Sequence, residues 1–232
     1  MIRLRKAAER GHFDFGWLDT SHTFSFGEYL DPAHMGFRSL RVINDDLIGP
    51  AQGFGTHGHR DMEILSWIVE GALEHKDSLG TGSVIRPGDL QRMSAGSGVR
   101  HSEFNPLPDR STRLLQIWIQ PSRSGLEPSY EQKHFPPEAR TNRLQLIAAP
   151  DGRDGALSVH QDAELWTALI APGTSVKHEF APGRHGWLQV VRGDLQLGAL
   201  ALSTGDGVAL SEERALEVHA RSDAEVLLFD LS

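Results

Sequence analysis

The sequence predicts an all-β protein built from two tandem antiparallel β-barrels. Three observations support this. Short apolar segments recur at a spacing of roughly 8–12 residues, 24 glycines and 12 prolines are available for turns, and no long stretch has the apolar period of an amphipathic helix. A chain of 232 residues accommodates one large β domain or two small ones. Because both halves contain short predicted strands at this spacing, we expect two domains.

The predicted strands are short and separated by turn residues. Residues 112–120 alternate most clearly, with Leu115, Ile117 and Ile119 on one face. In residues 37–44, the sequence Asn44-Asp45-Asp46 is expected to end the strand. The other predicted strands are 22–26, 62–69, 73–77, 83–86, 90–93, 143–148, 157–161, 165–170, 175–180, 187–191 and 225–231.

The proline-rich, charged stretch of residues 121–142 is the best candidate for a linker. We therefore expect an N-terminal domain over residues 1–134 and a C-terminal domain over residues 135–232. A faint repeat relates them. A strand ending in Glu70-Gly71 has a counterpart that ends at Gly193, and Pro87-Gly88-Asp89 has a counterpart in residues 204–206.

Composition excludes several kinds of site. With no cysteine, the chain has no disulfide, no zinc–thiolate site and no cysteine nucleophile. A net charge of −8 without a dense Lys/Arg cluster argues against direct nucleic-acid binding. No secretory signal and no apolar run long enough to cross a bilayer is present, so we expect a cytoplasmic protein without membrane contact. Serine-hydrolase, phosphate-loop and dinucleotide-binding motifs are also missing.

Two residue pairs form the candidate metal site. His57 and His59 flank Gly58, and His101 and Glu103 flank Ser102. On a β-strand, side chains at i and i+2 point to the same face, about 7 Å apart. Two such pairs on neighbouring strands aim three imidazoles and one carboxylate at one point, which is a plausible ligand set for a divalent transition metal.

Glu63 is the competing carboxylate. It shares parity with His57 and His59 but lies more than about 12 Å beyond His59 along a regular strand. Glu103 is therefore the preferred ligand and Glu63 a supporting acid. His75 is interpreted as a hydrogen-bonding strand residue. The other histidines lack partners at ligand spacing, which favours structural or surface roles for His12, His34, His134, His160, His178, His185 and His219.

The aromatic residues near the N-terminus allow two interpretations. Phe24 and Phe26 share one parity with His22, which favours core positions for both rings. The alternative is that some of Trp17, His22, Phe24 and Phe26 line a pocket.

Several motifs together resemble the pirin family of the cupin superfamily, in particular bacterial pirin-like quercetin 2,3-dioxygenases. They are G-W-L-D-T-S-H-T-F-S-F (residues 16–26), L-R-V-I-N-D-D (40–46), G-F-G-T-H-G-H-R-D-M-E (53–63), Q-R-M-S-A-G-S-G-V-R-H-S-E-F-N-P (91–106) and Q-I-W-I-Q-P (116–121). The resemblance is dense over residues 1–134 and weaker beyond.

This resemblance implies a bicupin fold with two jelly-roll-type barrels and a metal only in the N-terminal one. The family's ligands fall on His57, His59, His101 and Glu103. The implied metal is Fe(II), with Mn, Co, Ni, Cu or Zn as alternatives. The implied reaction is O2-dependent cleavage of a flavonol such as quercetin with release of carbon monoxide, in which Glu103 is the expected catalytic base.

Two other functions stay open from the sequence. One is a non-enzymatic regulator or redox sensor that acts through protein partners and uses the metal as a switch. The other is a different cupin enzyme, since a fold does not fix its substrate. Oxygen consumption and carbon monoxide release on addition of quercetin would distinguish the flavonol dioxygenase from the regulator.

Overall fold

The computed structural model describes residues 1–232 and divides them into two compact units. The N-terminal unit comprises Gly11–His134 and Val159–Gln161, and the C-terminal unit comprises Met1–Arg10, Phe135–Ser158 and Asp162–Ser232. Each unit contains one seven-stranded and one four-stranded sheet. Except for the short pair β13–β14, the paired strands run antiparallel. The all-β prediction with two tandem antiparallel barrels is thus confirmed.

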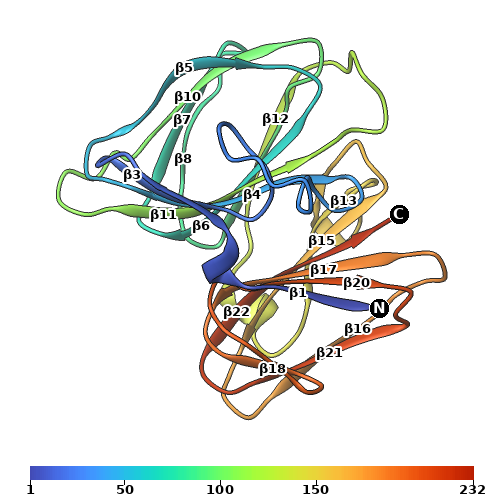
Figure 1. Ribbon diagram of the computed structural model, residues 1–232. Coiled ribbons are helices and arrows are strands. Elements are labelled where there is room, and N and C mark those ends of the chain that lie inside the picture. The colour runs from blue at the N-terminus through green and yellow to red at the C-terminus, as the bar shows by residue number, and fades with distance from the viewer. The chain divides into compact units, whose positions relative to one another are not determined.

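In the N-terminal unit the seven-stranded sheet has the order β12-β9-β6-β11-β4-β3-β2, and the four-stranded sheet has the order β5-β10-β7-β8. Figure 1 shows the smaller sheet facing the strands β6, β11 and β4 of the larger one. The strands are β2 (Gly11–Asp14), β3 (Leu18–His22), β4 (Leu40–Ile48), β5 (Gly53–His59), β6 (Glu63–Glu70), β7 (Leu73–Asp77), β8 (Gly82–Ile85), β9 (Asp89–Ser94), β10 (Val99–Phe104), β11 (Thr112–Ile119) and β12 (Ser129–His134).

In the C-terminal unit the corresponding orders are β1-β20-β17-β22-β15-β13-β14 and β16-β21-β18-β19. Its strands are β1 (Ile2–Arg5), β13 (Gln145–Ala149), β14 (Leu157–Ser158), β15 (Ala163–Ile170), β16 (Ser175–Glu179), β17 (His185–Arg192), β18 (Leu195–Leu197), β19 (Leu200–Leu202), β20 (Gly207–Ser211), β21 (Ala215–Ala220) and β22 (Ala224–Leu231). Three short helical turns complete the chain: η1 (Ala7–Glu9), α1 (Pro137–Arg140) and η2 (Arg153–Gly155).

The two large sheets share a topology, which explains the faint sequence repeat. Strand β6 lies between β9 and β11, and β17 lies between β20 and β22. The turn Pro87-Gly88-Asp89 leads into β9, just as the turn at residues 204–206 leads into β20. The repeated turns therefore precede equivalent strands of equivalent sheets.

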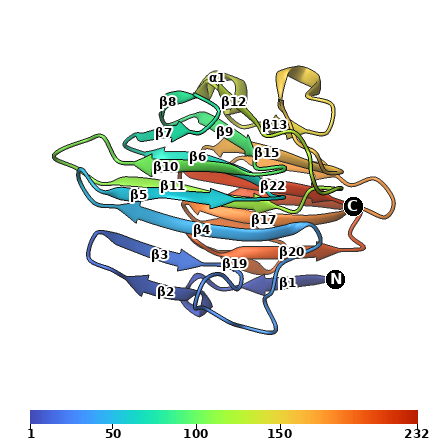
Figure 2. The same cartoon turned by 90° about the horizontal axis from the view of Figure 1, so that it is seen from above.

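Strand pairing moves some predicted boundaries. The prediction that Asn44-Asp45-Asp46 ends a strand is wrong, because β4 is hydrogen-bonded to β3 and β11 on its two sides as far as Ile48. In the predicted linker, β12 pairs with β9 along its whole length. Strand β3 ends at His22, so Phe24 and Phe26 lie in the connection that follows (Figure 2).

The first ten residues join the C-terminal unit, whereas the sequence-based boundaries placed them in the N-terminal domain. The reason is the pairing of β1 with β20, with Ile2 opposite Leu210. The other main division falls between His134 and Phe135. Both units have buried apolar cores, in which the largest side chains are Trp67 and Trp187. None of the helices is long and apolar enough to cross a membrane.

Candidate functional site

The two predicted residue pairs lie on neighbouring strands. His57 and His59 are on β5, His101 and Glu103 are on β10, and His57 is directly opposite His101. The register then shifts, so that Glu103 is opposite Phe54 and two residues of β5 face one residue of β10. Such a bulge re-aims side chains near functional sites. The regular strand geometry expected from the sequence does not contain this bulge.

Three imidazoles gather at this point. The donor nitrogens of His57, His59 and His101 all lie within 4.8 Å of one another. Nε2 of His57 is 3.1 Å from Nε2 of His101. For metal–nitrogen bonds of about 2.1 Å, two ligands at right angles are about 3.0 Å apart, so this spacing fits a shared cation.

The bulge also orients one of these rings. Nδ1 of His57 is 2.8 Å from the carbonyl oxygen of Gly55, which is one of the two bulged residues. A proton on Nδ1 satisfies this carbonyl and leaves the Nε2 lone pair toward the other rings. Metal-binding histidines are commonly fixed in this way by a backbone carbonyl.

Burial keeps two of the imidazoles neutral. Desolvation, followed by the charge of His57, lowers the pKa of His59 to about 4. Desolvation, followed by the charges of its histidine neighbours, lowers the pKa of His101 to about 3. Both rings therefore keep a free lone pair at neutral pH, which is the form that binds a metal.

Glu103 is almost completely buried beside these rings. Its Oε2 accepts a 2.8 Å hydrogen bond from Nε2 of Gln116, and its Oε1 accepts one of 3.3 Å from Oγ of Ser66. Burial, with a smaller contribution from the charge of Asp46, raises the pKa of Glu103 to about 7. A carboxyl group with this pKa can both take up and give back a proton near neutrality.

His75 adds a second cluster that the sequence interpretation underestimated. A donor atom of each of His75, His101 and Glu103 lies within 4.8 Å of the others, and His101 is common to both clusters. Nε2 of His75 is 2.9 Å from Asp77, which confirms the hydrogen-bonding role expected for His75. His75 and Asp77 show the same i, i+2 spacing as the two predicted pairs, and that spacing could have drawn attention to them.

Glu63 lies outside both clusters. Its carboxylate accepts a 2.9 Å hydrogen bond from Ser94 and is 3.3 Å from Nδ1 of His160. It is fully buried in this network and does not line the cavity described next. The structure thus places Glu103, and not Glu63, beside the imidazoles.

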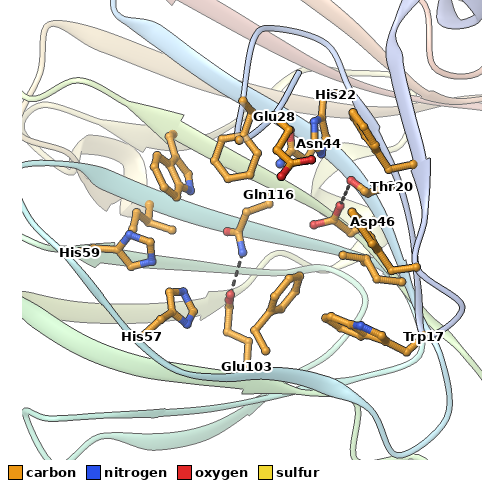
Figure 3. Close-up of a pocket in the computed structure, with 18 of the residues that line it drawn as sticks. Trp17, Thr20, His22, Glu28, Asn44, Asp46, His57, His59, Glu103 and Gln116 are labelled. Carbon is orange, nitrogen blue, oxygen red and sulfur yellow. Dashed lines mark hydrogen bonds between the residues drawn. The ribbon is translucent and has the colours of Figure 1, made fainter. Parts of the chain in front are cut away.

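A cavity of about 530 Å³ opens in front of the three imidazoles. Figure 3 shows His57 and His59 at one end of it, with Glu103 and Gln116 next to them. The walls are largely aromatic and are formed by Phe13, Phe15, Trp17, Phe26, Phe54 and Trp118. Such walls suit a flat, mostly apolar ligand.

Among the aromatic residues near the N-terminus, one packs in the core and others line the cavity. Phe24 is a core residue with 1% exposure. Trp17, His22 and Phe26 line the cavity, and Phe26 meets Trp118 edge-on with ring centroids 5.2 Å apart.

Five polar residues of the cavity were not singled out from the sequence as site residues: Thr20, Glu28, Asn44, Asp46 and Gln116. Asn44 and Asp46 were assigned to a strand end, where polar residues are unremarkable. Their i, i+2 spacing, repeated by Thr20 and His22, was the available signal that they share one face of a sheet.

Known proteins resemble this chain over its full length. Residues 3–119 match the model of the Pirin family, and residues 146–231 match that of the quercetinase C-terminal cupin domain. The chain is 51% identical to quercetin 2,3-dioxygenase of Escherichia coli K12, over 100% of this chain and 99% of that protein. It is 38% identical to a pirin-like protein of Caulobacter vibrioides, over 99% of each.

A solved structure is similar over the same length. The bacterial pirin YhhW from Escherichia coli, in complex with nickel(II), superimposes with a TM-score of 0.94 at 51% identity. The alignment covers 100% of this chain and 99% of YhhW.

Proposed function

Since the chain belongs to the pirin family, we propose that it is a metal-dependent dioxygenase that cleaves flavonols such as quercetin with O2 and releases carbon monoxide. The observation that carries this proposal is the aromatic cavity that ends at three clustered imidazoles and a buried carboxylate. The relatives named quercetin 2,3-dioxygenase support the choice of substrate.

In this proposal His57, His59, His101 and Glu103 hold one divalent metal. Three imidazole nitrogens and one carboxylate oxygen are donors that Fe(II), Mn, Co, Ni, Cu and Zn all accept. We propose Fe(II) as the native metal, which metal analysis of protein purified from its own host tests. When bound, the metal supplies Lewis-acid stabilisation of the anionic substrate oxygens.

The protein's own residues contribute binding and proton transfer. The aromatic walls hold the flat flavonol and exclude water from it. A carboxylate oxygen of Glu103 takes the proton of the 3-hydroxyl group, while Gln116 and Ser66 hold this carboxylate in place. Both atoms of O2 then end in the cleaved ester product, and the carbon that bore the 3-hydroxyl group leaves as carbon monoxide.

A comparison of two buried carboxylates tests the role of Glu103. Metal-loaded parent, Glu103→Gln and Glu63→Gln proteins are supplied with quercetin while O2 consumption, carbon monoxide and metal content are measured. We expect Glu103→Gln to lose at least about 100-fold in turnover, a typical size for loss of a general base, and Glu63→Gln to keep turnover within about threefold of the parent. A Glu103→Gln protein that works at the parent rate would refute the role of Glu103.

The ligand set is tested separately by metal content. Gln replaces His57, His59 and His101 one at a time, and His134, half-exposed and hydrogen-bonded to Asp89, serves as the matched control. We expect each of the three variants to lose metal and the His134→Gln control to retain it. If the parent protein consumes no O2 with quercetin when loaded with any of the six metals, the dioxygenase proposal fails and the regulatory alternative gains support.

A further inference from the structure

The cavity has a second polar end, away from His57, His59 and His101. Thr20 is paired with Asp46, and His22 with Asn44, across the neighbouring strands β3 and β4. All four side chains are buried and line the cavity. Figure 3 shows them on the side opposite His57 and His59, with Gln116 and Glu103 in between.

Two buried acceptor groups at this second end are only partly satisfied by hydrogen bonds. Oδ1 of Asp46 accepts a 2.5 Å hydrogen bond from the hydroxyl group of Thr20, and no cationic side chain pairs with this carboxyl group. Oδ1 of Asn44 is buried and has no hydrogen-bond partner. Buried acceptors without donors are costly, so a polar arrangement of this kind is expected to serve a ligand.

The adjacent residue on β4, Asp45, differs from Asp46 in having a cationic partner. Asp45 is not among the residues that line the cavity, and it makes two 2.9 Å hydrogen bonds with the guanidinium group of Arg113. Asp46 receives no such compensation, and burial raises its pKa to about 7. The unpaired carboxyl group is thus the one that faces the cavity.

We propose that Asp46 and Asn44 form a subsite that binds phenolic hydroxyl groups on the part of the substrate remote from His57, His59 and His101. The inference rests on the proposed function for its substrate class, a polyhydroxylated flavonol. A phenolic O–H supplies the donor that the second oxygen of Asp46 and the amide oxygen of Asn44 lack. Anionic groups do not fit here, because the site holds an acidic side chain and no cation.

Two flavonols that differ only in remote hydroxyl groups test the subsite. 3-Hydroxyflavone carries the 3-hydroxyl and 4-carbonyl groups alone, whereas quercetin adds hydroxyl groups on both outer rings. Metal-loaded protein is titrated with each ligand under argon, where no turnover occurs, and quenching of tryptophan fluorescence reports the dissociation constant. Trp17 and Trp118 in the cavity wall provide the signal.

Three variants are compared with the parent in this assay. Asp46→Leu removes the acceptor, Asp46→Asn keeps a neutral acceptor, and Asp45→Asn is the matched control. We expect Asp46→Leu, which loses a charged hydrogen-bond partner, to weaken quercetin binding by about 10–100-fold. Asp46→Asn, which replaces a charged acceptor with a neutral one, should weaken it by about 3–10-fold. Binding of 3-hydroxyflavone should change by less than about threefold in both, and Asp45→Asn should leave both ligands unaffected.

The two proposals fail in different ways. If Asp46→Asn binds both flavonols as the parent does, or loses affinity for both equally, the subsite is wrong even when turnover of quercetin is normal. If the selective loss appears but no parent protein consumes O2 with quercetin, the subsite stands and the dioxygenase proposal is wrong. The Asp46→Asn variant, which nearly preserves shape, keeps the test decisive if Asp46→Leu does not fold.

Discussion

Nε2 of Gln116 on β11 donates a 2.8 Å hydrogen bond to Oε2 of Glu103 on β10. The amide oxygen of Gln116 accepts a 3.1 Å hydrogen bond from Ser66, whose hydroxyl group is also 3.3 Å from the other oxygen of Glu103. The three side chains form a closed, buried triangle that joins the two facing sheets of the N-terminal unit. The position of the Glu103 carboxylate therefore depends on residues of the opposite sheet.

Replacing Gln116 with Leu should impair the site without removing any proposed ligand. The variant leaves one carboxylate oxygen of Glu103 without its donor, and loss of such a supporting contact typically costs 10–100-fold in metal affinity or activity. Competition with a chelator measures metal affinity. Gln120→Leu is the control, since Gln120 is exposed and contacts Arg41. Equal metal affinity in both variants would contradict the positioning role.

A side chain at Gly53 should destabilise the protein, whereas a side chain at Gly55 on the same strand should be tolerated. A Cβ atom at Gly53 would overlap the carbonyl oxygen of Glu103 and Cα of Phe104, but a Cβ atom at Gly55 meets nothing within 4 Å. We expect Gly53→Ala to lower the free energy of unfolding by about 1–3 kcal/mol, as for overpacked sites, and to weaken metal retention by pushing β5 from β10. Chemical denaturation and metal analysis check this. Gly55→Ala should stay within about 0.5 kcal/mol of the parent, and equal effects would refute the argument.

The buried carboxyl group of Asp46 should make stability depend on pH. Its pKa rises from 3.8 to about 7 on folding, mainly through burial. The folded state then binds the proton more tightly than the unfolded state, so this group's stabilising contribution is complete below about pH 4 and is lost as pH rises to about 7. Asp46→Asn removes the effect. Relative to the parent, the metal-free variant should therefore gain about 1–4 kcal/mol between pH 4 and 8.

Urea denaturation of both metal-free proteins at several pH values measures this difference. All other residues are common to both proteins, so their contributions cancel in the comparison. A difference in unfolding free energy that stays constant from pH 4 to 8 would show that the pKa of Asp46 is not raised in the folded state.

In the C-terminal unit, Glu225 should be important for stability. Its two carboxylate oxygens are bound by Arg140 at 2.9 Å and by Arg192 at 2.6 Å, and Glu225 and Arg140 are both buried. Glu225→Ala leaves a buried guanidinium group without its counter-charge, which typically costs 3–5 kcal/mol. Thermal and chemical unfolding measure the loss. The exposed Lys177–Glu179 pair provides the control, because an exposed ion pair contributes little to stability, and Glu179→Ala should leave the unfolding free energy nearly unchanged.

The sequence predicted strands and the positions of the clustered imidazoles well, because both depend on alternation along a strand. His57, His59 and His101 are close together for the reason their spacing indicated. The bulge opposite Ser102 was not predictable, since it arises from pairing between strands and not from either strand alone. The same holds for β1, whose partner β20 lies near the other end of the chain.

Buried polar residues were the hardest to interpret. Asn and Asp are common in turns. Asn44 and Asp46 line the cavity because β4 pairs with β3 and β11 through these residues. His75 was correctly assigned a hydrogen bond, but its closeness to His101 depends on the register between β7 and β10. Residue type and local spacing do not contain this information.

The pairing of β1 with β20 also sets an order on folding during synthesis. Met1–Arg10 are synthesised well before their partner strand Gly207–Ser211. Until then, the opening segment has no edge to bind, and a fragment starting at residue 135 would expose β20 as a bare edge prone to aggregation. The large sheet of the C-terminal unit is thus completed by residues from both ends of the chain, and trimming the first few residues should harm the second half of the protein more than the first.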